Sequence, residues 1–208
     1  MEVKIFDNTG KATKKVATLS DAIFGIEPND HAIYLDVKQH LANRRQGTHK
    51  SKERAEISGS TRKLKKQKGT GGARAGSVKS GTRVGGGRIF GPRPRDYHFK
   101  LNIKLKRLAR QSALAYKAKT DSILVIEDLS VETPRTKDFI ALLSNLSLTN
   151  EKVLFVVGSN DSNVYMSARN LGRVKVSVAS DINTYDVLNA KKIVLAQSSI
   201  EVIENILN

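Results

Sequence analysis

The sequence predicts an α/β protein: a three-layer body with a mostly parallel sheet of about four to five strands and helices on both faces, plus a long extended basic arm. Two observations lead to this prediction. After residue 120, short apolar runs alternate with segments of helical periodicity, which is typical of parallel strands covered on both sides. Within residues 46–97 neither pattern persists, and Lys, Arg and Gly dominate. We therefore expect one discontinuous domain, residues 1–45 and 98–208, that carries residues 46–97 as an inserted arm.

The first part of the chain predicts one strand and two helical segments. A strand is expected at Val3–Phe6, and the polar segment Lys11–Thr18 is either its hairpin partner or a loop. A helical turn is expected at Asp21–Phe24. A longer helix should begin at Pro28–Asp30 and end near Asn43, because proline suits a first turn and Asn or Asp side chains cap free amides. Its apolar stripe has a period of four residues and consists of Ile33, Val37 and Leu41.

A further helix is predicted from about Asn102, with different residues on its two sides. One face is mainly apolar and consists of Leu101, Leu105, Leu108, Ala109, Ser112, Ala115 and Tyr116. The opposite side is cationic and consists of Lys100, Lys104, Arg107 and Arg110. That side either faces solvent or faces RNA, and the sequence leaves both interpretations open.

The remainder alternates between strands and helices. Strands are predicted at Ser122–Ile126, Lys152–Val157, Lys175–Val178 and Ile193–Ala196. Helices are predicted at Thr136–Leu146, Asn163–Asn170, Tyr185–Asn189 and Ser199–Leu207. Such alternation favours crossover connections and therefore a parallel sheet.

The charge of the chain lies in one stretch. Residues 44–110 hold 21 of the 36 Lys and Arg residues, 3 of the 20 Asp and Glu residues, and 11 of the 15 glycines. Their net charge of +18 exceeds the +16 of the whole chain. The middle of this stretch has too few apolar residues to offset the entropy of ordering it, so it should be disordered alone or ordered by a polyanion. Clustered cations favour nucleic-acid phosphates, since binding releases condensed counterions.

Several other classes of function lack the residues they need, and no cofactor or metal is expected. The chain has no cysteine, which excludes disulfides and thiolate sites. Its four histidines have no metal-ligand spacing, and they are His31, His40, His49 and His98. The pair Glu127-Asp128 follows a strand, where it is either catalytic or, more commonly, caps a turn or repels bulk anions. Asp161 follows another strand, and for it we favour a cap of the next helix over a nucleotide-binding turn. Gly69–Gly72 lacks the Lys-Ser/Thr pair of a nucleotide phosphate loop.

No membrane association is expected, because the amino end has no secretory signal and the longest apolar runs are too short to span a bilayer. The mixture of Lys, Arg and Gly suits an irregular RNA surface better than a DNA groove. Phe90 and Tyr97 either stack on unpaired bases or form a hydrophobic seam, and for Phe99 we favour the seam. The candidate RNA-binding residues are Arg44, Arg45, Lys50, Lys52, Arg54, Arg62, Lys63, Lys65, Lys66, Gln67, Lys68, Gly69, Thr70, Gly71, Arg74, Lys79, Arg83, Arg88, Arg93, Arg95, Lys100, Lys104, Arg107 and Arg110.

A set of motifs gives a more specific indication. They are Gln46-Gly47-Thr48, Lys66-Gln67-Lys68-Gly69-Thr70-Gly71, Ala73-Arg74 with Gly76-Ser77, Gly91–Tyr97, Val131–Lys137 and Ala168–Leu171. Together they resemble the family of large-subunit ribosomal protein four (the L-four family, bacterial type) over essentially the whole chain. Lys65 and Gly72 depart from the family pattern, which commonly has Trp and Arg at those positions.

The resemblance implies a non-enzymatic, primary binder of large-subunit rRNA in the cytoplasmic ribosome that acts early in subunit assembly and contacts several rRNA domains and neighbouring ribosomal proteins. It also implies that the arm forms part of the polypeptide exit tunnel wall and meets the nascent polypeptide. The implied tip residues are Lys66, Gln67, Lys68, Gly69, Thr70 and Arg74. Some members of the family also repress their own operon. Two alternatives are an RNA-processing α/β enzyme with a basic substrate clamp, and a regulator or chaperone with a free basic arm.

Overall fold

The structure, a computed structural model, describes residues 1–129, 131 and 133–207. The chain divides into two compact units. The first, which we call the body, comprises residues 1–41 and the described residues from 100 onward. The second, which we call the basic unit, comprises Ala42–Phe99.

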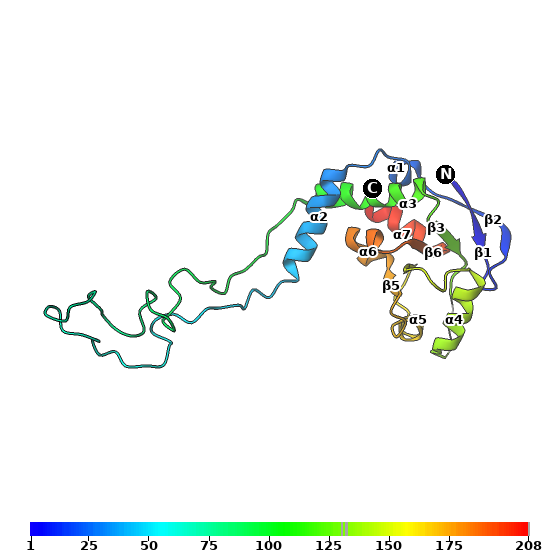
Figure 1. Cartoon of the computed structure of the whole chain (residues 1–208). Helices are drawn as coiled ribbons and strands as arrows, with labels where there is room; N and C mark the ends of the chain where they lie inside the picture. Colours follow the sequence, from blue (N-terminus) through cyan, green and yellow to red (C-terminus); the bar gives the residue numbers. More distant parts are fainter. Residues whose placement is uncertain (130, 132, 208) are drawn as a thin grey trace. The chain divides into compact units, whose positions relative to one another are not determined.

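In the described residues, the strands of the body form one six-stranded sheet with the order β2-β1-β3-β6-β4-β5 (Figure 1). The strands are β1 (Glu2–Phe6), β2 (Ala12–Thr18), β3 (Ile123–Ile126), β4 (Val153–Val157), β5 (Val174–Val178) and β6 (Lys192–Ala196). The β1–β2 pair is antiparallel and all the other pairs are parallel. The prediction of a mostly parallel sheet is confirmed. The sheet exceeds the predicted size because Lys11–Thr18 supplies the hairpin partner of β1 rather than a loop.

Seven α-helices and one short 3-10 helix accompany the sheet in the described residues. They are α1 (Asp21–Phe24), α2 (Asp30–Asn43), α3 (Ile103–Lys119), α4 (Thr136–Asn145), α5 (Ser162–Ala168), η1 (Ala179–Asp181), α6 (Thr184–Asn189) and α7 (Gln197–Leu207). Asn29 caps α2, since its side-chain oxygen accepts a hydrogen bond from the Ala32 amide at 3.0 Å. Asn102 caps α3 in the same way, as its side chain accepts from the Lys104 amide. Both helices therefore begin where the polar residues in the sequence indicated.

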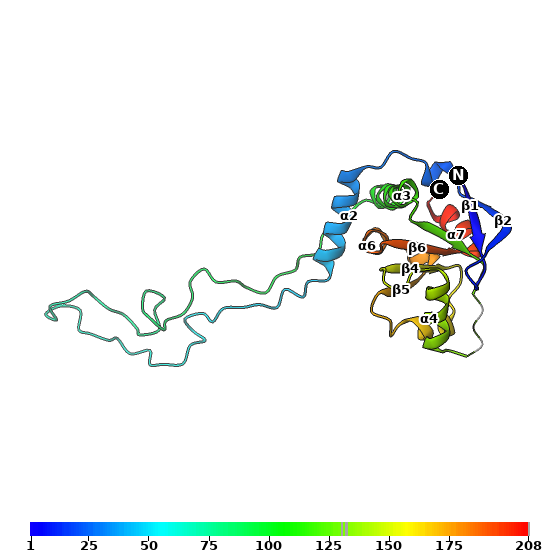
Figure 2. The same cartoon turned by 45° about the vertical axis from the view of Figure 1, so that its right-hand side comes forward.

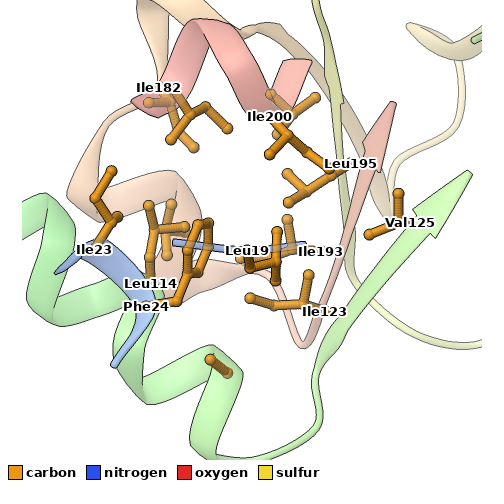
Figure 3. Close-up of a cluster of buried hydrophobic side chains, with 14 of the residues drawn as sticks. Leu19, Ile23, Phe24, Leu114, Ile123, Val125, Ile182, Ile193, Leu195 and Ile200 are labelled. Atoms are coloured by element: carbon orange, nitrogen blue, oxygen red, sulfur yellow. The ribbon is translucent and has the colours of Figure 1, made fainter. Parts of the chain in front are cut away.

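Helices cover both faces of the sheet, as predicted (Figure 2). Successive side chains of β4 point to opposite sides, so Leu154 and Val156 belong to one buried cluster and Phe155 to the other. The first cluster adds apolar residues of α1, α3, α6 and α7, and Figure 3 shows part of it. The second adds residues of α4 and α5. The near-continuous apolar runs of the strands follow from this arrangement, because both faces are buried.

The apolar stripe predicted for α2 does not form the buried face of that helix. Its members are largely accessible: Ile33 and Val37 are half-buried and Leu41 is exposed. The buried residues of α2 are instead Ala32 and Gln39. Apolar residues are spread around this helix, with Leu35 on a different side from the stripe, so their spacing alone could not fix the inward face.

The basic unit has no helix or strand in its described residues beyond the end of α2. Backbone hydrogen bonds join residues far apart in its sequence: the Ser51 amide donates to the Pro92 carbonyl at 3.1 Å, and the Arg88 amide donates to the Lys52 carbonyl at 3.0 Å. Almost every side chain of the unit is accessible, and Ala75 is its one buried hydrophobic residue. The unit therefore lacks a core of its own, as its composition indicated.

Candidate nucleic-acid interface

The candidate RNA-binding residues are accessible. All of them are exposed except Lys79 and Arg110, which are half-buried. Lys100, Lys104 and Arg107 are exposed cations at the start of α3, in the body, whereas most of the others lie in the basic unit. Exposed Lys and Arg side chains can meet phosphates without first breaking packed contacts.

Four of the predicted cations come together around one hollow of about 600 Å³ in the basic unit. Arg62, Lys63, Lys65 and Lys66 line this hollow together with Leu64. The Leu64 amide donates to the Gly76 carbonyl at 3.0 Å, which holds this part of the chain against the segment that follows the predicted tip. Four cations around one concave surface can bind more than one phosphate oxygen at a time.

Two glycines among the tip candidates have backbone conformations that other residues rarely adopt. Gly69 has a φ of +77° and Gly71 a φ of +63°. No atom lies within 4 Å of the position where a Cβ of either residue would be, so the space around them is open. It is the positive φ, and not crowding, that requires glycine here.

The ring of Tyr97 contacts two arginines. The guanidinium of Arg45 is 3.7 Å from the ring centroid, and that of Arg95 is 4.7 Å from it. The Tyr97 hydroxyl lies 3.3 Å from Nε2 of His49. A hydrogen bond from Arg95, together with the charges of Arg95 and Arg45, lowers the pKa of Tyr97 from its ordinary value. We call Arg45, Tyr97 and Arg95 the Tyr97 stack.

The Tyr97 stack closes the basic unit at its two sequence ends, because the Arg95 amide also donates to the Gly47 carbonyl at 3.2 Å. The sequence did not indicate this arrangement. The spacing of Arg95 and Tyr97 could have done so, since residues two apart in extended chain lie on one side. Phe90 differs from Tyr97, as its side chain is 96% exposed, and stacking of Phe90 on bases stays a prediction.

The two glutamates of the basic unit each pair with a candidate cation. Arg93 lies 2.7 Å from Glu53, and Lys50 pairs with Glu56. The hydrogen bond from Lys50 is the main cause that lowers the pKa of Glu56. Exposed pairs of this kind contribute little to stability, so exchanging a glutamate for an RNA phosphate costs little free energy.

The acids that follow strands act as caps and as an ion-pair partner. Oδ1 of Asp128 accepts hydrogen bonds from the amide and hydroxyl of Ser198 at the start of α7, at 3.0 and 2.6 Å. Oδ1 of Asp161 accepts from the Asn163 amide at 2.8 Å and caps α5. Glu127 pairs with Lys15 at 3.0 Å. The capping interpretation of Asp128 and Asp161 is thus confirmed.

No group of three or more His, Cys, Asp or Glu side chains suited to a metal ion occurs among the residues that the structure describes. Within the same residues, no helix has the length and apolar character needed to cross a bilayer.

An α/β body whose strand-end acids act as caps, in one chain with a unit of accessible cations, is typical of a basic structural protein. A family model described as "Ribosomal protein L4/L1 family" matches residues 17–206. The chain is 60% identical to the large ribosomal subunit protein uL4 of Parabacteroides distasonis, over 98% of each chain. It is 57% identical to the uL4 protein of Phocaeicola vulgatus over the full length of both, and 60% identical to that of Christiangramia forsetii over 99% of each.

The chain belongs to the ribosomal protein L4/L1 family. This confirms the resemblance that its motifs indicated, although Glu132 of the motif Val131–Lys137 lies outside the described residues. The protein is accordingly a structural protein of the large ribosomal subunit, which in bacteria is cytoplasmic, and not an enzyme.

Proposed function

We propose that the protein binds large-subunit rRNA through the candidate residues between Arg44 and Arg110. The observation that carries this proposal is the separation of charge: this stretch has a net charge of +18, and its candidate residues are almost all exposed. RNA phosphates are the polyanion that a large-subunit protein meets, and clustered cations bind them by releasing counterions.

In this proposal residues 46–97 form an arm that is ordered by rRNA from several domains, early in assembly of the subunit. Lys66, Gln67, Lys68, Gly69, Thr70 and Arg74 lie at its tip and contribute to the wall of the exit tunnel, where they meet the nascent polypeptide. The unit's lack of a core supports this role, since its order must come from a partner. Contacts with neighbouring ribosomal proteins, and repression of the protein's own operon, belong to the same proposal.

The proposal can be tested with a variant in which Lys63, Lys65, Lys66 and Lys68 become Gln. All four side chains are exposed, so the variant should fold normally. Binding of a large-subunit rRNA transcript is measured as a function of salt. If each lysine neutralises one phosphate, the slope of log K against log salt becomes shallower by about 3.

A matched control replaces four exposed lysines of the body, Lys4, Lys11, Lys14 and Lys137, by Gln. The control makes the same change in net charge, and its salt slope should stay close to that of the unchanged protein. Equal slopes for the two variants would contradict the proposal, because the binding energy would then depend on net charge alone.

The tunnel position has its own test. A photo-crosslinking residue in place of Lys68 should couple to a stalled nascent chain in assembled large subunits. The same residue in place of Lys137, in the body, should not. Coupling at Lys137 and not at Lys68 would contradict the proposed tip.

A further inference from the structure

Six cations of the body, far apart in sequence, gather at one edge of the sheet. We call them the strand-start cluster: Lys117, Lys152, Arg173, Lys175, Lys191 and Lys192. Lys152 directly precedes β4, Arg173 directly precedes β5, and Lys192 is the first residue of β6. Because β6, β4 and β5 are parallel neighbours, their starts lie at the same edge. Lys117, in the last turn of α3, reaches this edge by donating to the Ala190 carbonyl at 2.6 Å.

The surface of the strand-start cluster is concave. Two hollows of about 320 and 560 Å³ adjoin here and share Lys152, Arg173, Asn189 and Ala190 in their walls. The residues outside 44–110 carry a small net negative charge, so this concentration of cations is local and does not follow from the composition of the body.

Four of the six cations have only neutral acceptors. Lys117 donates to a backbone carbonyl, Lys152 to the side-chain oxygen of Asn189 at 3.4 Å, Arg173 to the Asn150 carbonyl at 2.8 Å, and Lys192 to the Asp121 carbonyl at 2.8 Å. The salt bridges of the described residues include none from these four.

The other two cations are paired: Lys175 lies 2.5 Å from Asp186, and Lys191 lies 2.6 Å from Glu151. The cluster as a whole therefore keeps an excess of positive charge. Burial first, and then the charge of Lys192, lower the pKa of Lys117, which agrees with crowding of like charges at this edge.

We propose that the strand-start cluster binds consecutive phosphates of an RNA backbone, as a second RNA contact that is separate from residues 44–110. Neighbouring strands are about 4.8 Å apart, so three adjacent strand starts span about 10 Å. That span is about three times the axial rise of roughly 3.4 Å per phosphate along one strand of duplex DNA. Because phosphates along an RNA strand are also closely spaced, the cluster can meet more than one of them.

The chemistry of the lining favours phosphates over a protein partner. Protein interfaces have an apolar centre, whereas most accessible groups in these walls are polar: amines, a guanidinium, amides and the Glu151 carboxylate. Val153 and Leu154 are buried within the sheet, and the exposed large apolar side chain of the lining is Leu188, at 37%. Lysine neutralises phosphate as a point charge and does not select a base. The contact should therefore depend on the shape of the RNA and not on its sequence.

The test uses the full-length protein with Lys152→Gln, Arg173→Gln and Lys191→Gln combined, since all three side chains are exposed. The matched control carries Lys4→Gln, Lys137→Gln and Arg169→Gln, which are also exposed residues of the body. Binding to a large-subunit rRNA transcript is measured across a salt series. The cluster variant should have a slope shallower by about 2 to 3, and the control should keep that of the unchanged protein.

A measurement on the unchanged protein gives independent support. Acylation of lysines, read by mass spectrometry, should be slowed by rRNA at Lys152 and Lys191 and not at Lys4 and Lys137. The inference would be overturned if the slope of log K against log salt were the same for the cluster variant and the control variant, and if acylation of Lys152 and Lys191 were equal with and without RNA. A slope shallower by about 3 in the variant of Lys63, Lys65, Lys66 and Lys68 would still support the proposed function, so the failure of the inference and the failure of the proposed function can be told apart. The inference would also be overturned if the cluster variant bound RNA normally but a neighbouring ribosomal protein were lost from reconstituted subunits. In that case the cluster would bind an acidic protein and not RNA.

Discussion

Truncation of Phe155 tests whether the stability of the chain resides in the body. Phe155 lies in β4, is 1% exposed, and meets the ring of Phe139 on α4 edge to face with 4.9 Å between the centroids. The change Phe155→Ala removes nearly the whole of a buried aromatic side chain and leaves a cavity between the sheet and α4. The strands on both sides of β4 limit how far the surroundings can collapse into that cavity.

The expected loss of stability follows from these contacts. Truncating a buried Phe to Ala costs about 3–5 kcal/mol, and an edge-to-face pair contributes roughly 0.5–1.5 kcal/mol beyond its buried area. We expect the free energy of unfolding to fall by about 4 kcal/mol, which is on the order of a 1000-fold change in the folding equilibrium.

Urea unfolding followed by circular dichroism measures this loss, because the helices of the body dominate the signal. Phe90→Ala is the matched control: the same substitution in the basic unit, at a side chain that is 96% exposed. It should change the free energy of unfolding by no more than about 0.5 kcal/mol. A cost at Phe90 equal to that at Phe155, or a cost below about 1 kcal/mol at Phe155, would refute the conclusion that the body alone carries the core.

Three further predictions concern single contacts. The change Gly47→Ala should speed proteolysis of the basic unit, because residue 47 has a φ of +64° and a Cβ there would lie 2.1 Å from the Arg95 carbonyl oxygen. The control Gly76→Ala, at a position with open space around it, should not change the rate of proteolysis. In an ultraviolet titration Tyr97 should ionise with a pKa below the ordinary 10.0, because Arg95 and Arg45 stabilise its phenolate. Tyr116 should ionise with a pKa above that value, because its hydrogen bond to the Asp30 carboxylate opposes ionisation. Phe substitutions assign the two transitions, and the reverse order of the two pKa values would contradict this reasoning. The change Asp128→Ala removes the cap of α7 and should lower the free energy of unfolding, measured by urea unfolding, by about 1 kcal/mol. An unchanged free energy would mean that α7 does not depend on this cap.

The sequence predicted the body well where one pattern determined the outcome. β4 is a run of five buried apolar residues, and no other element suits so short a run in an alternating α/β order. β2 stayed ambiguous because only Ala17 of its residues is buried, so its place at the sheet edge leaves little pattern. The prediction of the inward face of α2 was wrong. Apolar residues are spread around this helix, and the residues that packing buries are Ala32 and Gln39.

The candidate interface was predictable as a composition but not as a geometry. Charge and glycine content marked residues 44–110, yet the ring contacts of Tyr97 depend on bringing Arg45 and Arg95 together from 50 residues apart. The strand-start cluster was not predictable at all, because its members are separated by helices and strands. Lys117 and Arg173 are 56 residues apart, which is too far for a local sequence pattern to link them, and only the parallel sheet brings them to one edge.

The pairing of β1 with β3 has a consequence for the order of events during synthesis. These strands are neighbours in the sheet, and Ile5 pairs with Val125, yet everything from Asp7 to Ser122 is translated between them. At bacterial elongation rates this interval is on the order of ten seconds, during which β1 has only β2 beside it. The whole cationic insertion thus leaves the ribosome that makes it before the sheet can close, so its positive charge is accessible while the amino-terminal hairpin still lacks its central partner.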